Sequence, residues 1–190
     1  MSGSGVSQLA LPGMCTVRDA IERMASESRI EERGAIYTRR EVVEFILDLV
    51  GYTVDRPLAE YRLLEPSFGA GDFLLPALER LLEGARRSSK CVRPERLEPA
   101  LRGVELHRDT FERTKQEAHS TLVRNGVKHA EADRLVQVWL RQGDFLLESS
   151  DHEFTHIVGN PPYVRHESIP DIFMKEYRRR FETIYDLISH

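Results

Sequence analysis

The fold class of this chain is decided by the stretch Glu65-Pro66-Ser67-Phe68-Gly69-Ala70-Gly71-Asp72-Phe73, which joins two patterns of different period. Before it, residues 61–65 are typical of a short strand, and after it residues 72–84 place apolar side chains at helical spacing. Its two glycines permit positive φ angles, and the unpaired N–H groups at a helix start attract ligands. A plain strand-to-helix turn shares these features, so the stretch alone leaves both interpretations open.

The residues that follow repeat the alternation of strand and helix. A strand is expected over residues 101–106 and a helix over 109–125, with further strands over 134–141 and 152–158. Residues 84–100, which contain two prolines and many arginines, are expected to form a surface connection. This order predicts the α/β class, with a doubly wound, Rossmann-like parallel sheet.

The amino-terminal part is predicted to be helical. Residues 1–33 are interpreted as an extension that carries a helix over 16–33, and residues 34–190 as the main domain. A second helix is expected over 39–50, ending at Gly51. We expect this helix to bury a wide apolar face, which consists of Val42, Val43, Phe45, Ile46, Leu49 and Val50.

Composition narrows the classes of function. The chain has 190 residues, a formal net charge of -4, 41% hydrophobic and 31% charged residues, which indicates one soluble globular domain. No apolar run is long enough to cross a membrane, and no secretory signal is visible. Cys15 and Cys91 lie far apart without metal-ligand spacing, so a cytoplasmic protein without a metal site is expected.

Two acidic residues follow predicted strands and suit a nucleoside ligand. Glu105 ends the second strand, where a carboxylate can accept hydrogen bonds from ribose hydroxyls. Asp144 and Phe145 follow the third strand, and they could accept from an exocyclic amine and stack on a purine. The glycine stretch lacks the third glycine of the dinucleotide fingerprint, and Glu65 beside it would repel pyrophosphate but suit an ammonium group.

The most specific pattern is Asn160-Pro161-Pro162-Tyr163, which follows the fourth predicted strand. The two prolines fix φ and remove backbone donors, which leaves rigid carbonyls that can only accept. The Asn160 side-chain carbonyl adds a second acceptor, and Tyr163 adds an aromatic ring. Convergent acceptors beside a ring predict a site for one planar amine.

Three motifs together resemble the N6-adenine DNA methyltransferases of the gamma order, many of which belong to restriction–modification systems. They are Gly34-Ala-Ile-Tyr-Thr38, Glu65-Pro-Ser-Phe-Gly-Ala-Gly71 and Asn160-Pro-Pro-Tyr163, in the order that the family has them. The resemblance runs from about Gly34 to Asp186. It implies S-adenosylmethionine as the methyl donor and double-stranded DNA as the substrate, with the target adenine flipped out of the helix.

The resemblance also implies a role for each matching residue. The catalytic residues would be Asn160, Pro161, Pro162 and Tyr163. The methionine end of the cofactor would be held by Tyr37, Thr38, Glu65, Pro66, Gly69 and Gly71. Glu105 would hold the ribose, and Asp144 with Phe145 the adenine.

Two departures from the family pattern are visible. Arg39 replaces the proline that normally follows the threonine, and the sequence ends at His190, before the remaining strands and the target-recognition domain of the family. The chain therefore resembles an amino-terminal portion, whose partners would be a carboxy-terminal half or a target-recognition or nuclease subunit. The alternatives are a protein glutamine methyltransferase, whose substrate has a similar planar amide, an RNA methyltransferase, and a non-catalytic subunit.

Overall fold

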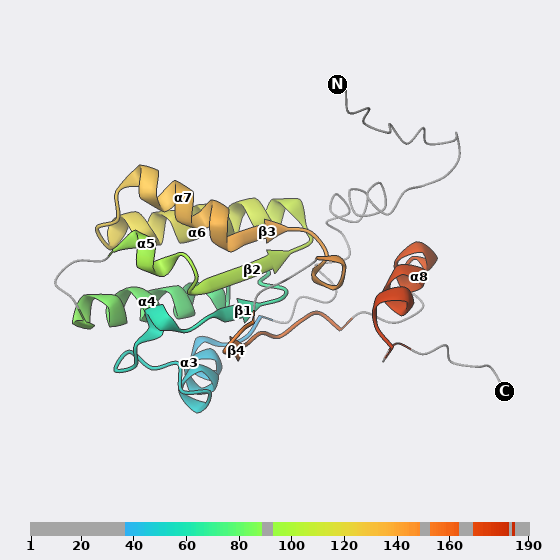
Figure 1. Cartoon of the computed structure of the whole chain (residues 1–190), viewed down its shortest axis with the longest axis horizontal. Helices are drawn as coiled ribbons and strands as arrows, with labels where there is room; N and C mark the ends of the chain where they lie inside the picture. The colour runs from blue at the N-terminus through green and yellow to red at the C-terminus, as the bar shows by residue number, and fades with distance from the viewer. Residues whose placement is uncertain (1–36, 89–92, 149–152, 164–168, 183, 185–190) are drawn as a thin grey trace, which may run out of the picture.

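The computed structural model describes residues 37–88, 93–148, 153–163, 169–182 and 184. Four parallel strands form one sheet in the order β3-β2-β1-β4 (Figure 1). The strands are β1 (Leu63–Glu65), β2 (Leu101–Glu105), β3 (Leu140–Gln142) and β4 (His156–Ile157). The predicted α/β class and the parallel sheet are confirmed.

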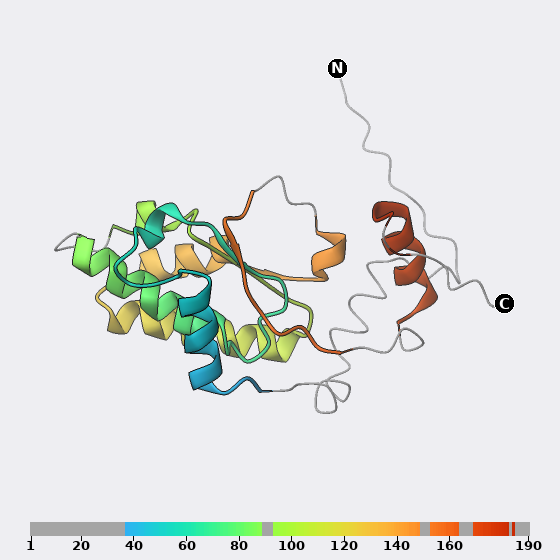
Figure 2. The same ribbon diagram turned by 90° about the horizontal axis from the view of Figure 1, so that it is seen from below.

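Helices connect these strands and cover the sheet. The α-helices are α3 (Arg40–Leu49), α4 (Leu74–Ser88), α5 (Pro94–Leu97), α6 (Arg108–Arg124), α7 (His129–Trp139) and α8 (Asp171–Arg180). Two 3-10 turns are η1 (Leu58–Glu60) and η2 (Phe145–Leu147). Figure 2 shows α3, α4 and α6 along one side of the sheet, where α4 contacts both of the others. None of the helices in the described part of the chain is long and apolar enough to cross a membrane.

Helix α4 forms the centre of the core, as its spacing predicts. Its apolar face is fully buried and consists of Leu74, Ala77, Leu78, Leu81 and Leu82. The helix continues to Ser88, and the chain then forms α5, whose Pro94 and Leu97 are buried. The expectation that residues 84–100 form a surface connection is therefore wrong, because apolar positions in this stretch also contribute to the core.

The strand predicted over residues 134–141 is wrong for most of its length. Helix α7 runs through Trp139, and only Leu140 and Arg141 of the predicted stretch belong to β3. The buried residues Leu135, Val136 and Trp139 share one helical face. The Trp139 indole Nε1 donates to the Leu97 carbonyl at 3.1 Å, which ties α7 to α5. A short apolar run fits both periods, so only packing distinguishes them.

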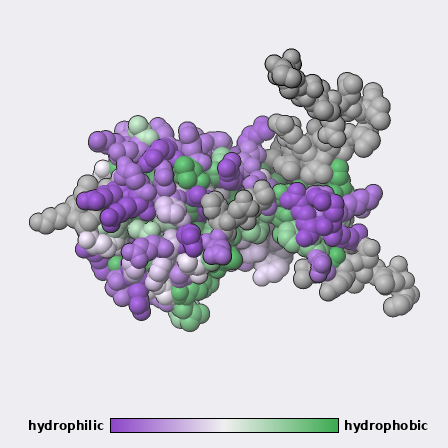
Figure 3. All heavy atoms as spheres, viewed as in Figure 1, coloured by the Kyte–Doolittle hydropathy of each residue, from purple (hydrophilic) through white to green (hydrophobic). Residues whose placement is uncertain are grey.

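The first described helix, α3, buries less than expected. Val43 and Leu47 are fully buried, whereas Val42, Phe45, Leu49 and Val50 are exposed. Figure 3 shows hydrophobic residues gathered at the lower edge of the view, where Figure 1 places α3. The predicted helix over residues 16–33 lies outside the described residues, and the strand predicted over 152–158 is confined to His156 and Ile157.

Arg80 of α4 fixes the position of α3. Its guanidinium donates to the Glu44 carboxylate, to Asp48 Oδ1 at 2.6 Å and to the Tyr52 carbonyl at 2.9 Å. The Arg80 side chain is only 13% exposed, so these bonds are shielded from much of the solvent. Because Thr38 stands just before α3, this anchoring also places the start of the described chain beside the sheet.

Candidate active site

The sheet order creates a topological switch point between β1 and β4. The chain proceeds outward from β1 through β2 to β3, and then returns to place β4 on the other side of β1. The backbone of Val158 donates to the Leu64 carbonyl at 3.0 Å, which brings the residues after β4 beside the end of β1. Open α/β sheets bind ligands at this point, outside the carboxyl ends of the strands.

The glycine stretch between β1 and α4 has a backbone that larger residues would not fit. Gly69 has φ 49° and Gly71 has φ 86°, both in the left-handed region. A Cβ on Gly71 would lie 2.9 Å from side-chain atoms of Leu75 and of Thr114. The Thr114 hydroxyl donates to the Gly69 carbonyl at 2.8 Å, so helix α6 also holds the turn in place.

Glu105, at the end of β2, fastens this turn to the sheet. The side chain is 3% exposed, its Oε2 accepts from the Gly69 N–H at 2.8 Å, and its Oε1 accepts from the His107 N–H at 2.8 Å. A buried carboxylate with a bond to each oxygen is stabilised in place. A carboxylate has two oxygens and about four acceptor sites in all, so a residue of this type can also accept from ligand hydroxyls.

Glu65, at the end of β1, is equally buried but differently bonded. The residue is 2% exposed, and its Oε2 has no hydrogen-bond partner among the described residues. Burial raises the pKa of Glu65 well above its usual range, and the negative charges of Asp72 and Glu105 raise it further, while a hydrogen bond from the Leu74 backbone opposes the rise. Such an acceptor suits a cationic ligand group.

Asn160 lies across the switch point from Glu65. A Cβ on the preceding Gly159 would lie 3.5 Å from Glu65 Cγ and 3.6 Å from Pro66 Cδ, so the backbone that leads into Asn160 runs close to the end of β1. The Asn160 amide Nδ2 donates to Thr38 Oγ1 at 3.3 Å, which brings the third motif to the same place. The structure therefore brings together residues from all three predicted motifs.

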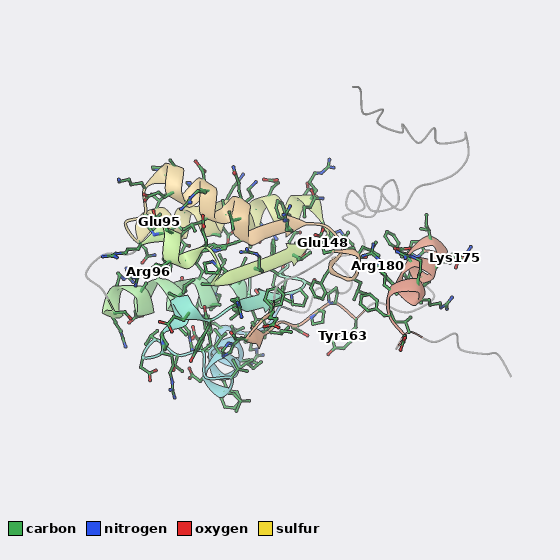
Figure 4. All side chains as sticks on the ribbon, in the orientation of Figure 1. Glu95, Arg96, Glu148, Tyr163, Lys175 and Arg180 are labelled. Carbon is green, nitrogen blue, oxygen red and sulfur yellow. The ribbon has the colours of Figure 1, made fainter. Side chains whose placement is uncertain are left out.

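The tyrosines of the first and third motifs are exposed. Tyr163 is 80% exposed and Tyr37 is 71% exposed. In Figure 4 the Tyr163 ring projects from the chain between β4 and α8. Pro161 and Pro162 are exposed as well. An exposed ring beside two rigid carbonyls is accessible to a base that arrives from outside.

Comparison with known sequences assigns the chain to a family. The sequence profile of the Eco57I restriction-modification methylase family matches residues 59–190. The chain belongs to that family. It is 51% identical over 174 residues to the Type II methyltransferase M.PaeR7I of Pseudomonas aeruginosa, a match that covers 91% of this chain and 30% of the relative.

Two further Type II methyltransferases are similar. M.XhoI of Xanthomonas vasicola is 51% identical over 158 residues, which cover 82% of this chain and 29% of the relative. M.BstVI of Geobacillus stearothermophilus is 39% identical over 171 residues, which cover 86% of this chain and 30% of the relative. This Eco57I-family chain thus spans about a third of the length of the relatives that it matches.

At the far end of the candidate site, this Eco57I-family chain holds Asp144 between two donors. Asp144 Oδ1 accepts from the Leu146 N–H at 2.9 Å, and its Oδ2 accepts from the Tyr177 hydroxyl of α8. Burial raises the pKa of Tyr177, and the hydrogen bond and charge of Asp144 raise it further. Phe145 begins η2 and is partly buried.

The sequence analysis missed Tyr177 and Asp72 as residues of the candidate site. Tyr177 belongs to a cluster in which α8 packs on Leu146 and Leu147, a contact that no local pattern indicates. Asp72 accepts from the Thr38 N–H at 2.7 Å through its Oδ2. Its place directly after Gly71 was a usable signal, because this position adjoins the glycine turn of the candidate site.

Proposed function

We propose that the natural full-length protein is a restriction–modification DNA methyltransferase that transfers a methyl group from S-adenosylmethionine to the N6 amine of a flipped adenine. The observation that carries the proposal is that two features lie close together: the buried Glu65 carboxylate with its unpartnered oxygen, and the backbone that leads into the Asn160-Pro-Pro-Tyr stretch. A cation-binding group next to acceptors for a planar amine fits a methyl donor with an ammonium group. The similarity to Type II methyltransferases supports the same reaction class.

Different residues of the site would bind different parts of the proposed cofactor. Glu65 would accept from its ammonium group, in reach of Tyr37, Thr38, Pro66 and the turn glycines Gly69 and Gly71. Glu105 would accept from the ribose hydroxyls, and Asp144 with Phe145 would hold the adenine. S-adenosylmethionine supplies an electrophilic methyl group on a positively charged sulfur.

The catalytic residues would act on the target amine. The lone pair of an adenine amine is delocalised into the ring, which makes it a poor nucleophile. The Asn160 Oδ1 and the Pro161 carbonyl would accept its two N–H groups, so that nitrogen becomes pyramidal and its lone pair is released. Such preorganised acceptors act where charge develops, and the loss of one typically lowers rates by about 10²–10³-fold.

Tyr163 would stack on the flipped base, and Pro162 would keep the adjoining backbone rigid. The exposed ring supports this role, since base–aromatic stacking is worth about 1–3 kcal/mol. We propose that the residues that recognise the DNA sequence lie outside the aligned region, which covers only 29–30% of each relative. In α8, Glu176 is paired with Arg179 and Arg180 at 2.7 and 2.8 Å, so two of the helix's basic residues are partly neutralised.

The test is transfer of labelled methyl from S-adenosylmethionine to DNA, RNA and protein by the natural full-length protein. We expect label in double-stranded DNA only, recovered as N6-methyladenine after digestion and mass spectrometry. Label on protein glutamine would favour the glutamine alternative, and label on RNA the RNA alternative. If S-adenosylmethionine binds but no acceptor is labelled, the non-catalytic subunit is favoured.

A further inference from the structure

Thr38 lies between two polar residues that are distant from it in sequence. Its backbone N–H donates to Asp72 Oδ2 at 2.7 Å, and its hydroxyl Oγ1 accepts from Asn160 Nδ2 at 3.3 Å. Both bonds are partly buried, and they span 34 and 122 residues of sequence. The three residues form a relay that ends on the proposed catalytic amide.

The orientation of that amide matters for the chemistry. A side-chain amide has one accepting end, Oδ1, and one donating end, Nδ2. Catalysis as proposed above needs Oδ1 towards the target amine, because Nδ2 there would set donor against donor. With Nδ2 bonded to Thr38, the Asn160 carbonyl oxygen is directed to the other side.

The position of Thr38 depends in turn on Asp72. Asp72 follows Gly71, whose positive φ turns the chain into α4, and its carboxylate holds the Thr38 backbone just before α3. A hydroxyl has one hydrogen and two lone pairs. When Oγ1 accepts from Asn160, the hydroxyl hydrogen is left for an acceptor on the cofactor, so Thr38 can serve both partners.

We propose that Asp72 and Thr38 are positioning residues that act through Asn160. Asp72 places the Thr38 backbone, and the Thr38 hydroxyl fixes the Asn160 amide with its carbonyl facing the target amine. The inference rests on the proposed function and extends it to residues that make no contact with the methylated base. It differs from a role in cofactor binding alone, which would leave the rate at saturating cofactor unchanged.

The first experiment compares Thr38→Val with Thr38→Ser in the natural full-length protein. Valine has nearly the same shape but lacks the hydroxyl, whereas serine keeps it. At saturating S-adenosylmethionine we expect Thr38→Val to lower the single-turnover methylation rate by about ten- to hundred-fold, as misplacement of a reacting group does. Thr38→Ser should stay within about three-fold of the wild-type rate, because the conservative variant restores the acceptor.

A matched control comes from the opposite end of the strands. The Thr155 hydroxyl accepts from the Arg62 N–H at 2.9 Å, a bond of the same type outside the site. Thr155→Val should therefore leave the single-turnover rate unchanged. If Thr38→Val changes only the cofactor dissociation constant, or if Thr38→Ser is as slow as Thr38→Val, the positioning role is wrong.

Asp72 is tested by a pair that separates its acceptor from its charge. Asp72→Asn keeps an oxygen that can accept from Thr38, and Asp72→Ala does not. We expect Asp72→Asn to retain most of the single-turnover rate. Asp72→Ala should lower that rate by about as much as Thr38→Val does. Equal losses in both variants would instead assign the effect to the Asp72 charge and overturn its part in the relay.

A double variant distinguishes failure of this inference from failure of the proposed function. If the relay acts only through Asn160, Thr38→Val should add nothing further to the loss in Asn160→Ala. Multiplied losses would overturn the relay. An Asn160→Ala protein that methylates at the wild-type rate would refute the proposed function, whereas a slow Asn160→Ala beside a fast Thr38→Val would refute the relay alone.

Discussion

Glu65 and Glu105 end neighbouring strands of the same sheet, and their burial is almost equal at 2% and 3% exposed. Their surroundings differ. Glu105 receives N–H groups from Gly69 and His107, one on each oxygen, while the Oε2 of Glu65 has no partner in the described part of the chain. Two glutamates of nearly equal burial therefore differ in the hydrogen bonds that their carboxylate oxygens accept.

The difference separates a carboxylate whose bonds stabilise the fold from one that keeps an oxygen without a partner among the described residues. Burial of an ionised carboxylate is unfavourable unless hydrogen bonds or charges compensate it. Glu105 has that compensation within the fold, and it is part of the scaffold of the glycine turn. Glu65 lacks it on one oxygen, and the pKa of Glu65 is raised accordingly. A cationic ligand group would supply what is missing.

The largest expected effect lies at Asn160, which neighbours Glu65 but belongs to the chemistry rather than to cofactor binding. Asn160→Ala should lower single-turnover methylation by about 10²–10³-fold and leave S-adenosylmethionine affinity nearly constant. Rapid-quench assays and calorimetry on the natural full-length protein measure the two quantities. An equal loss of affinity would place Asn160 with the cofactor residues instead.

Tyr163 provides the matched variants for base capture. Tyr163→Phe should retain much of the methylation rate and Tyr163→Ala should not, since stacking needs only the ring. The fluorescence of 2-aminopurine at the target position reports the flipped population. Unchanged fluorescence with Tyr163→Ala would contradict a stacking role.

Next in size is the response of cofactor affinity to Glu65→Gln. Loss of a charged acceptor for the ammonium group should weaken S-adenosylmethionine binding by about 1.5–3 kcal/mol, or roughly ten- to hundred-fold. The cofactor-free variant should be no less stable than the wild type, because an unpartnered buried carboxylate has been removed. Unchanged cofactor affinity in calorimetry would end the assignment of Glu65 to the ammonium group.

Glu105→Gln should behave in the opposite way and lower stability even without cofactor. The new amide NH₂ would face the N–H of Gly69 or of His107, and one buried donor would lose its acceptor. The expected decrease in the free energy of unfolding is about 1–3 kcal/mol. Chemical denaturation of the two Gln variants side by side measures this decrease. Equal stabilities would show that Glu105 contributes no more to the fold than Glu65 does. Glu105→Ala should also weaken cofactor binding, if the ribose assignment is right.

The pH dependence gives a smaller and separate signal. The pKa of Glu65 is raised in the folded protein, so the folded state holds its proton more tightly than the unfolded state does. Its contribution to stability is therefore full below the usual carboxylate range and is lost as pH rises through the raised pKa. Glu65→Gln should remove this decrease from the pH profile of the free energy of unfolding. An unaltered profile would contradict the raised pKa.

The smallest expected effect is at the other end of the site, where Asp144 resembles Glu105 in having both oxygens bonded. Tyr177→Phe keeps the packing of α8 but removes the hydroxyl that donates to Asp144. The loss of one orienting bond should weaken cofactor binding by about 0.5–1.5 kcal/mol. Tighter binding by the variant would show that Tyr177 competes with the cofactor for Asp144. Isothermal titration distinguishes the two outcomes.

The sequence alone predicted the class of the fold and the motifs that the structure brings together. Glycine spacing, helical period and rigid prolines are local properties, so the turn after β1, the buried face of α4 and the Asn160-Pro-Pro-Tyr stretch were all visible in it. The sequence did not determine where α7 ends and β3 begins. The apolar run there suits both periods, and Trp139 settles the matter through a bond to the distant Leu97.

The partners of the polar site residues were decided only by the tertiary structure. Strand position does not distinguish Glu65 from Glu105, because each is the last residue of a short parallel strand. The distinction comes from which N–H groups the glycine turn and the start of α6 direct at each carboxylate. Likewise, Thr38 meets Asn160 across 122 residues because the β4 strand returns to the side of β1. Hydrogen bonds between residues so far apart in the sequence depend on the order of the strands in the sheet, and that order is set by the tertiary packing of the whole chain.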